Sequence, residues 1–385
     1  MSKVALVHDY FIQMGGAERV AEEMHKLYPS APMFTTVDLR RQIPAELRKA
    51  KVHTSWMQNL PGMREHFRHY FAVYPLAVES LDLKEFDLIL SSSSGYAKGV
   101  RKRPGAIHVC YCHTPMRWAW RYEDYAAREQ FGAVKRKVLP LALSALRRWD
   151  LRAAAQPDFY IANSKNTARN IKEVYGRDAV VIPPPIDVNR FSANEPDGDY
   201  YLILSRMIAY KHLDLAVEAC KKLDRRLVVI GDGPDRKRLE SLAGKKTEFL
   251  GRQPDEVVAK YAGGCRALLF PGEEDFGMVP LEINAAGRPV ICYGAGGAME
   301  TVVDGETGIF FDRQSTDSLV AAIEEFEGIQ WNRQKIREHA EKFDTQIFNA
   351  RIQEFLDEAA PLSRRSEISQ SRAQPSFSST KVIAR

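Results

Sequence analysis

The order of apolar segments along the chain limits its fold more than any other feature. Short apolar runs of strand type alternate with segments of helical period, a rhythm typical of parallel α/β units. In the first half the expected strands are Val4–His8, Leu88–Ser91, Ile107–Cys112 and Phe159–Ala162. In the second half they are Tyr201–Leu204, Leu227–Ile230, Thr247–Leu250, Ala267–Phe270 and Pro289–Ile291. We therefore predict an α/β fold of two Rossmann-like domains facing across a cleft, with the ligand in the crevice at the carboxyl ends of the strands.

A connector separates the two halves. It begins with Pro183-Pro184-Pro185-Ile186-Asp187 and continues through the polar stretch Ser192–Asp199, a composition that favours extended chain. Predicted domains cover residues 1–188 and 189–343. A helix with one apolar face is expected over residues 344–360, and the Ser- and Arg-rich tail, residues 361–385, is expected to be disordered.

Length and composition exclude several classes of protein. A chain of 385 residues suggests two domains, and 45% hydrophobic with 27% charged residues is ordinary for a globular protein. The charged amino end does not resemble a signal peptide, and no stretch reaches the ~20 apolar residues that span a bilayer. We expect a cytoplasmic protein, with any membrane contact peripheral, at the inner face of the cell membrane. Its five cysteines are expected to be reduced core residues, namely Cys110, Cys112, Cys220, Cys265 and Cys292.

Charge is distributed unevenly along the chain. Residues 1–190 carry 29 Lys and Arg against 19 Asp and Glu, whereas the remaining residues are net acidic. The basic clusters are Arg64 with Arg68, Arg101-Lys102-Arg103, Lys135-Arg136-Lys137 and Arg147-Arg148. This asymmetry indicates either an anionic partner for the amino half or merely a solvated surface, and the sequence leaves both open.

The segment Phe270-Pro271-Gly272-Glu273-Glu274-Asp275-Phe276-Gly277 carries the strongest chemical signal. It joins an expected strand to an expected helix. Gly277 would let the backbone approach a ligand, and the amide groups of Met278 and Val279 would suit a diphosphate at the helix start. Glu282, a turn into the helix, could accept hydrogen bonds from a ribose diol, and Glu274 would face a sugar. Ordinary loop and helix-start charges are the alternative.

Two cations are expected at the same edge of the sheet. Arg206 directly follows the strand Tyr201–Leu204, and Lys211 comes five residues later, before a helical pattern. A guanidinium and an ammonium can stabilise a departing nucleoside diphosphate without a metal ion. Exposed charges at a helix start would give the same pattern.

The first half offers weaker signals. Gly15-Gly16 follows the first strand and opens a helix, so its backbone amides could approach a phosphate. His113 directly follows the strand Ile107–Cys112 and could donate a hydrogen bond to a sugar hydroxyl or to developing charge. A turn and a structural histidine are the alternatives.

Together these residues resemble glycosyltransferase family 4, whose members have the two-domain GT-B fold. The resemblance runs over about residues 3–360 and rests on the E-x7-E motif Glu274–Glu282, on Arg206 and Lys211, and on supporting motifs such as Gly251-Arg252 and Gly296-Gly297. Asp275 departs from the pattern, because many members have glycine there.

The resemblance implies a role for each site residue. Arg206 and Lys211 would hold the donor diphosphate, Glu282 the ribose and Glu274 the donor sugar, while His113 would contact the sugar near the reacting carbon. It also implies retention of anomeric configuration, no metal, no cofactor besides the nucleotide-sugar co-substrate, and a terminal helix that crosses back to the first domain.

Within the family, the segments His8-Asp9-Tyr10, Gly15–Arg19 and His113–Arg117 are similar to bacterial mannosyltransferases of O-antigen and exopolysaccharide synthesis. That resemblance implies GDP-mannose as donor and a polyprenyl-diphosphate-linked saccharide as acceptor, at an anionic membrane surface. No nucleic-acid partner is expected. A UDP-sugar donor, a non-catalytic sugar-nucleotide-binding protein and a nucleotide-sugar epimerase of similar fold remain alternatives.

Three other motifs have weaker interpretations. Asp197-Gly198-Asp199 mimics a metal-binding D-x-D motif but lies in the connector, and Gly231-Asp232-Gly233-Pro234 is expected to be a tight turn bordering the donor cleft. An aromatic cluster could stack on an acceptor sugar or form a packed loop; its members are Trp118, Trp120, Tyr122 and Tyr125.

Overall fold

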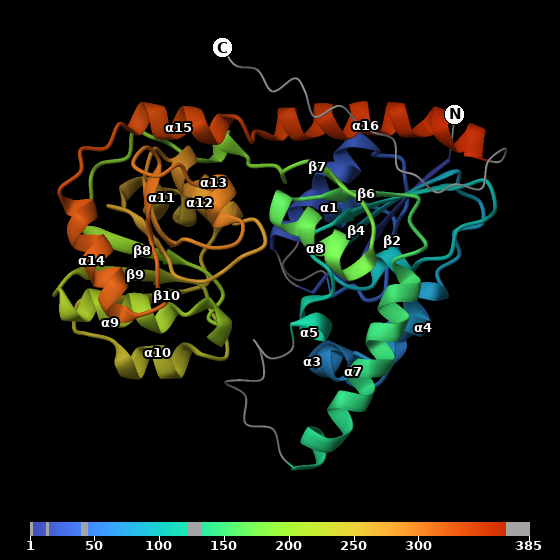
Figure 1. Ribbon diagram of the computed structural model, residues 1–385, viewed down its shortest axis with the longest axis horizontal. Helices are drawn as coiled ribbons and strands as arrows, with labels where there is room; N and C mark the ends of the chain where they lie inside the picture. Colours follow the sequence, from blue (N-terminus) through green and yellow to red (C-terminus); the bar gives the residue numbers. More distant parts are fainter. Residues whose placement is uncertain (1–2, 13–14, 40–44, 122–132, 367–385) are drawn as a thin grey trace. The chain divides into compact units, whose positions relative to one another are not determined.

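The computed structural model describes residues 3–12, 15–39, 45–121 and 133–366. These residues form two compact units (Figure 1). The N-terminal unit holds the described residues up to Pro183 together with those from Phe348 onward, and the C-terminal unit holds Pro184–Ile347. The division therefore lies inside the proline run of the connector.

Within its described residues, the N-terminal unit contains a parallel seven-stranded sheet in the order β3-β2-β1-β4-β5-β6-β7. The strands are β1 (Val4–His8), β2 (Met33–Thr35), β3 (Val52–Thr54), β4 (Leu88–Ser93), β5 (Ile107–Cys112), β6 (Phe159–Ala162) and β7 (Val180–Val181). The α-helices are α1 (Gly16–Leu27), α2 (Ala45–Lys49), α3 (Met63–His66), α4 (Tyr74–Glu79), α5 (Arg117–Trp120), α7 (Ala133–Ala153), α8 (Lys165–Tyr175) and α16 (Thr345–Ser366). Short 3₁₀ turns are η1 (Trp56–Asn59), η2 (Phe67–Tyr70) and η3 (Ala97–Gly99).

The C-terminal unit contains a parallel six-stranded sheet in the order β10-β9-β8-β11-β12-β13. Its strands are β8 (Tyr200–Leu204), β9 (Arg226–Ile230), β10 (Thr247–Gly251), β11 (Leu268–Phe270), β12 (Val290–Tyr293) and β13 (Gly308–Phe311). The helices are α9 (Leu213–Lys222), α10 (Arg236–Leu242), α11 (Asp255–Gly264), α12 (Met278–Ala285), α13 (Ala298–Thr301), α14 (Thr316–Glu327) and α15 (Arg333–Glu341), with 3₁₀ turns η4 (Val188–Arg190) and η5 (Ala209–Lys211).

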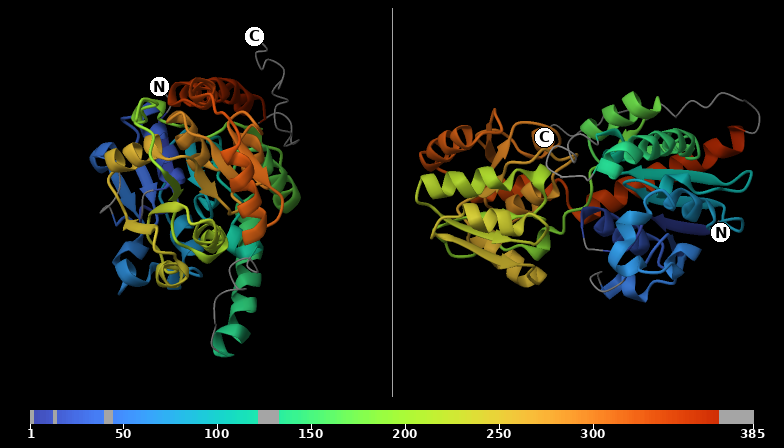
Figure 2. Two further views of the ribbon diagram at one scale, coloured as in Figure 1. Left: turned by 90° about the vertical axis from the view of Figure 1, so that its left-hand side faces the viewer. Right: turned by 90° about the horizontal axis from the view of Figure 1, so that it is seen from below.

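Each sheet is buried on both faces by helices, as Figure 2 shows. Successive side chains of a strand point to opposite faces, so Ala5 and Val7 of β1 belong to one apolar cluster and Leu6 to another. Parallel strands that are covered on both faces consist of continuous apolar runs, which explains why most of these strands could be predicted from the sequence. The predicted fold class, two Rossmann-like α/β domains, is confirmed.

Helix α16 returns to the N-terminal unit, as predicted. Phe348, Ile352 and Phe355 are buried in the same cluster as Leu6 and Val109, and the Asn349 amide donates to the Glu23 carboxylate over 3.2 Å. One boundary was wrong: the helix continues through Ser366, so residues 361–366 are helical and not part of a disordered tail. The remainder of the predicted tail lies outside the described residues.

Two further expectations concern the cysteines and membrane-spanning segments. All five cysteines are free and buried. None of the helices in the described ranges combines the length and the apolar character needed to cross a bilayer.

Candidate functional site

The sheet of the C-terminal unit changes its strand order between β8 and β11. Both strands are neighbours, with Leu202 opposite Leu268, although β9 and β10 come between them in sequence. The loops after neighbouring strands on either side of such a point diverge and leave a crevice that commonly holds ligands. Arg206 follows β8 and Glu274 follows β11, so the topology brings the predicted cation and carboxylate to one edge.

Lys211 and Glu274 meet there in an ion pair. Lys211 ends the turn η5, and its side chain is 14% exposed against 19% for Glu274. Gly272 makes this approach possible, because a Cβ at that position would lie 3.0 Å from the Lys211 backbone. The two groups are therefore partly withdrawn from water but still reachable, and Arg206 stands exposed on the same edge.

Helix α12 begins at this edge. Gly277 is its N-cap and has a left-handed backbone, with φ of 88°, which favours glycine. No side chain caps the helix, so the amides of the first turn, including Met278 and Val279, are not used by a capping group. Pro280 occupies the third helical position, where an amide would have no intrahelical partner. Phe276 is buried and anchors the loop, while Asp275 is half-buried.

Glu282 has a partner that the sequence analysis missed. The Arg190 guanidinium donates to Glu282 over 2.9 Å and to Asp255, the first residue of α11, over 3.2 Å. Arg190 and Glu282 are only 15% and 12% exposed. Arg190 lies in the connector, 92 residues before Glu282, and no local pattern marks it. The second glutamate is thus paired with a cation that is mostly withdrawn from water.

Close glycine contacts fix the loop that carries Glu274. The Gly297 amide donates to the Glu274 carbonyl over 2.8 Å. A Cβ on Gly297 would overlap the Phe276 backbone, and one on Gly296 would overlap the Glu274 carbonyl. Similarly, Gly231 has a positive φ and packs against the carbonyl of Ser205, so the predicted tight turn after β9 supports the segment that ends in Arg206.

In the N-terminal unit, the strand order changes between β1 and β4, and the predicted residues gather at that point. Gly15 is the N-cap of α1, and His8 ends β1. His113 follows β5, and its Nε2 lies 2.8 Å from the Ser92 hydroxyl oxygen of β4. That hydroxyl lies 3.1 Å from His8 Nδ1. Burial, followed by the nearby His8, lowers the pKa of His113 to about 3, so its imidazole is neutral at physiological pH.

The backbone around His113 is tightly held. Its amide donates to the Ser93 carbonyl over 2.9 Å, and its carbonyl accepts from the Asn163 amide over 2.9 Å. Asp9, directly after β1, accepts backbone hydrogen bonds from Ser94, Tyr96 and Ala97. The sequence analysis noted His8 and Asp9 only as part of a motif and missed Ser92.

Two family models match almost the whole described chain. The model of glycosyltransferase family 4 matches residues 14–190, and the model of glycosyl transferases group 1 matches residues 186–343. The first includes Gly15, Gly16 and His113, and the second includes Arg206, Lys211, Glu274 and Glu282. The chain belongs to glycosyltransferase family 4.

Curated proteins similar to this chain are named as glycosyltransferases. An uncharacterized glycosyltransferase of Methanocaldococcus jannaschii is 29% identical over 196 residues, covering 50% of this chain and 56% of the relative. A GDP-mannose-dependent alpha-(1-6)-phosphatidylinositol monomannoside mannosyltransferase of Mycolicibacterium smegmatis is 29% identical over 219 residues, covering 48% and 56%. The matched region thus spans about half the length of these curated relatives.

Among solved structures, HepE of Anabaena in complex with UDP and glucose has a TM-score of 0.66 and 18% identity, covering 93% of this chain and 100% of its own. At this identity the likeness shows the fold alone, which is the two-domain GT-B fold.

The D-x-D mimic has a structural explanation. Asp197 forms ion pairs with Arg288 and Arg333, and Asp199 pairs with Arg226 over 3.0 Å. Within the described ranges, no group of three or more His, Cys, Asp or Glu side chains is arranged to hold a metal ion. The expected independence of metal stays a prediction.

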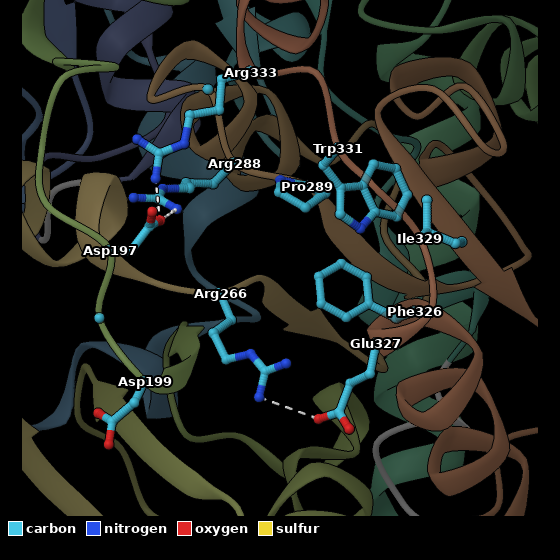
Figure 3. A pocket seen from close by; sticks show the side chains of 12 residues that line it. Asp197, Asp199, Arg266, Arg288, Pro289, Phe326, Glu327, Ile329, Trp331 and Arg333 are labelled. Atoms are coloured by element: carbon cyan, nitrogen blue, oxygen red, sulfur yellow. Dashed lines mark hydrogen bonds and ion pairs between the residues drawn. The ribbon is translucent and has the colours of Figure 1, made fainter.

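A pocket of about 460 Å³ lies beside Asp197, at the amino ends of the strands and therefore at the opposite edge from Glu274. Figure 3 shows Arg288 and Arg333 converging on Asp197 at one side, and Arg266 reaching Glu327 at the other. Its position at the amino ends of the strands separates this pocket from the edge that carries Arg206, Lys211 and Glu274.

The remaining candidates are mostly packed or paired. Trp118 packs edge-on against Phe71, and Trp120 Nε1 donates to Asp150 over 2.7 Å, which favours the packed-loop interpretation; Tyr122 and Tyr125 lie outside the described residues. The cluster Arg101-Lys102-Arg103 pairs with Glu79, Asp158 and Asp87 respectively. The side chains of Arg68 and Lys135-Arg136-Lys137 lie outside the described part.

Proposed function

We propose that this chain is a glycosyltransferase that moves a hexose from a nucleotide diphosphate-sugar to an acceptor hydroxyl. The observation that carries the proposal is the Lys211–Glu274 ion pair beside the uncapped start of α12, at the point where the strand order of the C-terminal sheet changes. A cation, a carboxylate and helix amides at one edge match the diphosphate and hydroxyl groups of such a donor.

The proposed roles follow the chemistry of each group. Arg206 and Lys211 bind the diphosphate, and the amides of Met278 and Val279 add dipoles aimed at the same charge. Glu282, oriented by Arg190, accepts hydrogen bonds from the ribose diol. Glu274 accepts from sugar hydroxyls once the donor phosphate competes for Lys211. His113 contacts the sugar near the reacting carbon, and Gly15 and Gly16 leave room for the phosphate.

The proposed reaction retains anomeric configuration. The bond between the anomeric carbon and the phosphate oxygen breaks, the acceptor oxygen bonds to the same face of that carbon, and the acceptor proton passes to the departing phosphate. Arg206 and Lys211 stabilise the negative charge that develops on the leaving group, and preorganised cations can do so without a metal ion.

Mannose from GDP-mannose is the donor that we favour. The motifs around His8, Gly15 and His113 support it, as does the likeness to a mycobacterial enzyme named as GDP-mannose-dependent. A UDP-sugar donor is the second candidate, because base selection depends on loop contacts outside these motifs. Loss of a donor-site group would favour a non-catalytic sugar-nucleotide-binding protein, whereas both glutamates, both cations and His113 are present in this chain.

The proposed acceptor is a polyprenyl-diphosphate-linked saccharide of cell-surface polysaccharide synthesis, reached at the inner face of the cell membrane. The basic amino half would favour an anionic surface. Helix α7 projects from the rest of the N-terminal unit in Figures 1 and 2 and exposes Leu141, which is 75% accessible. An exposed leucine on a basic helix suits the boundary of an anionic bilayer.

Thermal unfolding with a panel of nucleotides tests the donor proposal. The purified protein is melted with GDP, UDP, ADP, GDP-mannose and UDP-glucose, each with excess EDTA, because a ligand that binds the folded state raises the melting temperature. We expect a selective rise with GDP and GDP-mannose. A selective rise with UDP and UDP-glucose would replace the donor, and no rise with any nucleotide would contradict the proposed activity.

A further inference from the structure

Four buried polar side chains form a continuous row where the strand order of the N-terminal sheet changes. Glu18 lies in the first turn of α1, His8 ends β1, Ser92 lies in β4, and His113 follows β5. Their exposed fractions are 4%, 3%, 0% and 9%. Burying polar groups together is costly unless they find partners, so the contacts among these four side chains need to be followed one by one.

The contacts run in one order. Glu18 Oε1 lies 4.0 Å from His8 Nε2. His8 Nδ1 lies 3.1 Å from Ser92 Oγ, and Ser92 Oγ lies 2.8 Å from His113 Nε2. The last two distances are ordinary hydrogen bonds, whereas the first is longer and acts mainly through charge. The Ala17 carbonyl, 3.5 Å from the same hydroxyl, is a weaker acceptor.

For neutral histidines, the charge of Glu18 favours one arrangement of protons along this row. A carboxylate favours an N–H on the nearer nitrogen of His8, which is Nε2. His8 Nδ1 then carries a lone pair and accepts from the Ser92 hydroxyl. Since a hydroxyl has only one proton to donate, Ser92 must accept from His113, and the proton of His113 therefore lies on Nε2.

We propose that Glu18, His8 and Ser92 are positioning residues that fix the tautomer of His113, with its proton on Nε2 and its lone pair on Nδ1. His113 then acts as a hydrogen-bond acceptor toward a hydroxyl, not as a donor. Contact with a sugar hydroxyl rests on the proposed function, whereas the tautomer itself does not. Burial, the larger of the two causes that lower the pKa of His113, keeps its ring neutral.

The tautomer can be read directly by nuclear magnetic resonance. In the full-length protein labelled with ¹⁵N-histidine, at pH 8 and without nucleotide, the protonated and unprotonated ring nitrogens have well separated shifts. The His113 signals are assigned by their loss in His113→Gln. We expect protonated Nε2 and unprotonated Nδ1 in His113 and in His8. A proton on Nδ1 of His113 in the wild-type protein would by itself overturn the proposal.

Two variants test the order of the row. Ser92→Ala removes only the bridging hydroxyl, and we expect the His113 nitrogens to move toward a mixture of both tautomers. Glu18→Gln keeps the size of the side chain but removes the charge that selects His8 Nε2–H, so we again expect a mixture at His113. Unchanged His113 signals in both variants would overturn the proposal.

The neighbouring residue provides a matched control. Ser91 Oγ lies 2.8 Å from Nε2 of the buried His108, so β4 carries two serine–histidine contacts of equal length. Ser91→Ala removes a comparable hydrogen bond outside the row. We expect it to change the His108 signals and to leave the His113 signals unchanged. That result would show that the effect of Ser92→Ala is specific to the row and is not a general disturbance of β4.

Activity then links the row to catalysis. We expect Ser92→Ala to lower kcat for transfer by about tenfold, the scale of one hydrogen bond, with the KM for donor changed much less. Ser91→Ala should leave kcat near wild type. If the tautomer is as expected but Ser92→Ala keeps full kcat, the catalytic part is wrong. Absence of transfer by the wild-type protein, with the expected tautomer, would contradict the proposed function alone.

Discussion

Glu274 and Arg206 follow neighbouring strands at the same edge of one sheet but differ in burial. Glu274 is 19% exposed and paired with Lys211, whereas Arg206 is exposed. A carboxylate that binds the sugar contributes mainly as the reaction proceeds, and a guanidinium that binds the diphosphate contributes to ground-state binding as well.

We therefore expect Glu274→Ala to lower kcat by more than about tenfold with a smaller loss of nucleotide affinity, and Arg206→Ala to impair both. Steady-state kinetics and calorimetric titration of nucleotide measure the two effects. Glu273→Ala, the adjacent carboxylate, serves as the control and should stay near wild type. Wild-type rates in both Glu274→Ala and Arg206→Ala would remove the proposed site.

Arg190 makes contacts that local sequence patterns do not predict. Its guanidinium reaches Glu282 and Asp255 from the connector, and a cation paired with a carboxylate across such a separation leaves no periodic trace in the sequence. Ser92 and His8 are similar: serine at the end of a buried strand is common, and only the pairing of β1 with β4 brings the two together.

At the scale of elements, the loop of Gly296-Gly297 fixes the position of the Glu274 loop. The Gly297 amide bonds to the Glu274 carbonyl, and the lack of a Cβ allows contact with the Phe276 backbone. Backbone atoms cannot rotate out of the way as a flexible side chain can. A methyl group added at Gly297 must therefore displace one of the two loops.

Gly297→Ala should consequently weaken donor binding, whereas Gly294→Ala, in the same loop, should be tolerated. A Cβ at Gly294 would meet Phe310 Cβ only at 3.5 Å, which is ordinary van der Waals contact. Titration of both variants with the nucleotide that stabilises the wild type makes the comparison. Equal affinities for the two variants would contradict the role given to Gly297.

Helix α16 offers a second matched pair. Ile352 is fully buried in the core of the N-terminal unit, whereas Ile347 of the same helix is 40% exposed. Ile352→Ala should lower the free energy of unfolding by about 2–5 kcal/mol, because it leaves a cavity, and Ile347→Ala by less than about 1 kcal/mol. Denaturant unfolding followed by circular dichroism gives both values. Similar losses in the two variants would show that α16 does not pack as described, and truncation before Thr345 should destabilise the protein further.

At the scale of the whole molecule, two features bear on the proposed membrane contact. They are the excess of basic residues in the amino half and the projecting helix α7. The cluster at Arg101–Arg103 pairs with carboxylates of the same half, so the net basic excess of that half comes from other residues. The exposed Leu141 on α7 is the structural feature that favours a membrane over a merely solvated face.

Leu141→Ser should therefore reduce binding to vesicles that contain anionic lipid, measured by co-sedimentation, and binding should also fall as salt increases. Met299→Ser, which alters a residue 55% exposed in the C-terminal unit, is the control and should bind like the wild type. Binding that is equal for both variants, or equal on neutral vesicles, would contradict the proposed membrane contact.

The sequence by itself determined the fold class and most strands, and it predicted the residues of the donor motif. Buried parallel strands are continuous apolar runs and can be located in the sequence. Glycines and charged residues that directly follow such a strand can then be predicted to lie at the edge of the sheet. The strands it missed, β2, β3, β7 and β13, have two to four residues each, and three of them, β3, β7 and β13, lie at the edges of their sheets. The end of α16 was also placed too early.

Only the tertiary structure decided which of these residues act together. It paired Lys211 with Glu274, supplied Arg190 to Glu282, and aligned Glu18, His8, Ser92 and His113. The physical reason is that local sequence fixes backbone periodicity and burial, whereas hydrogen bonds and ion pairs depend on distances between strands and loops that are remote along the chain.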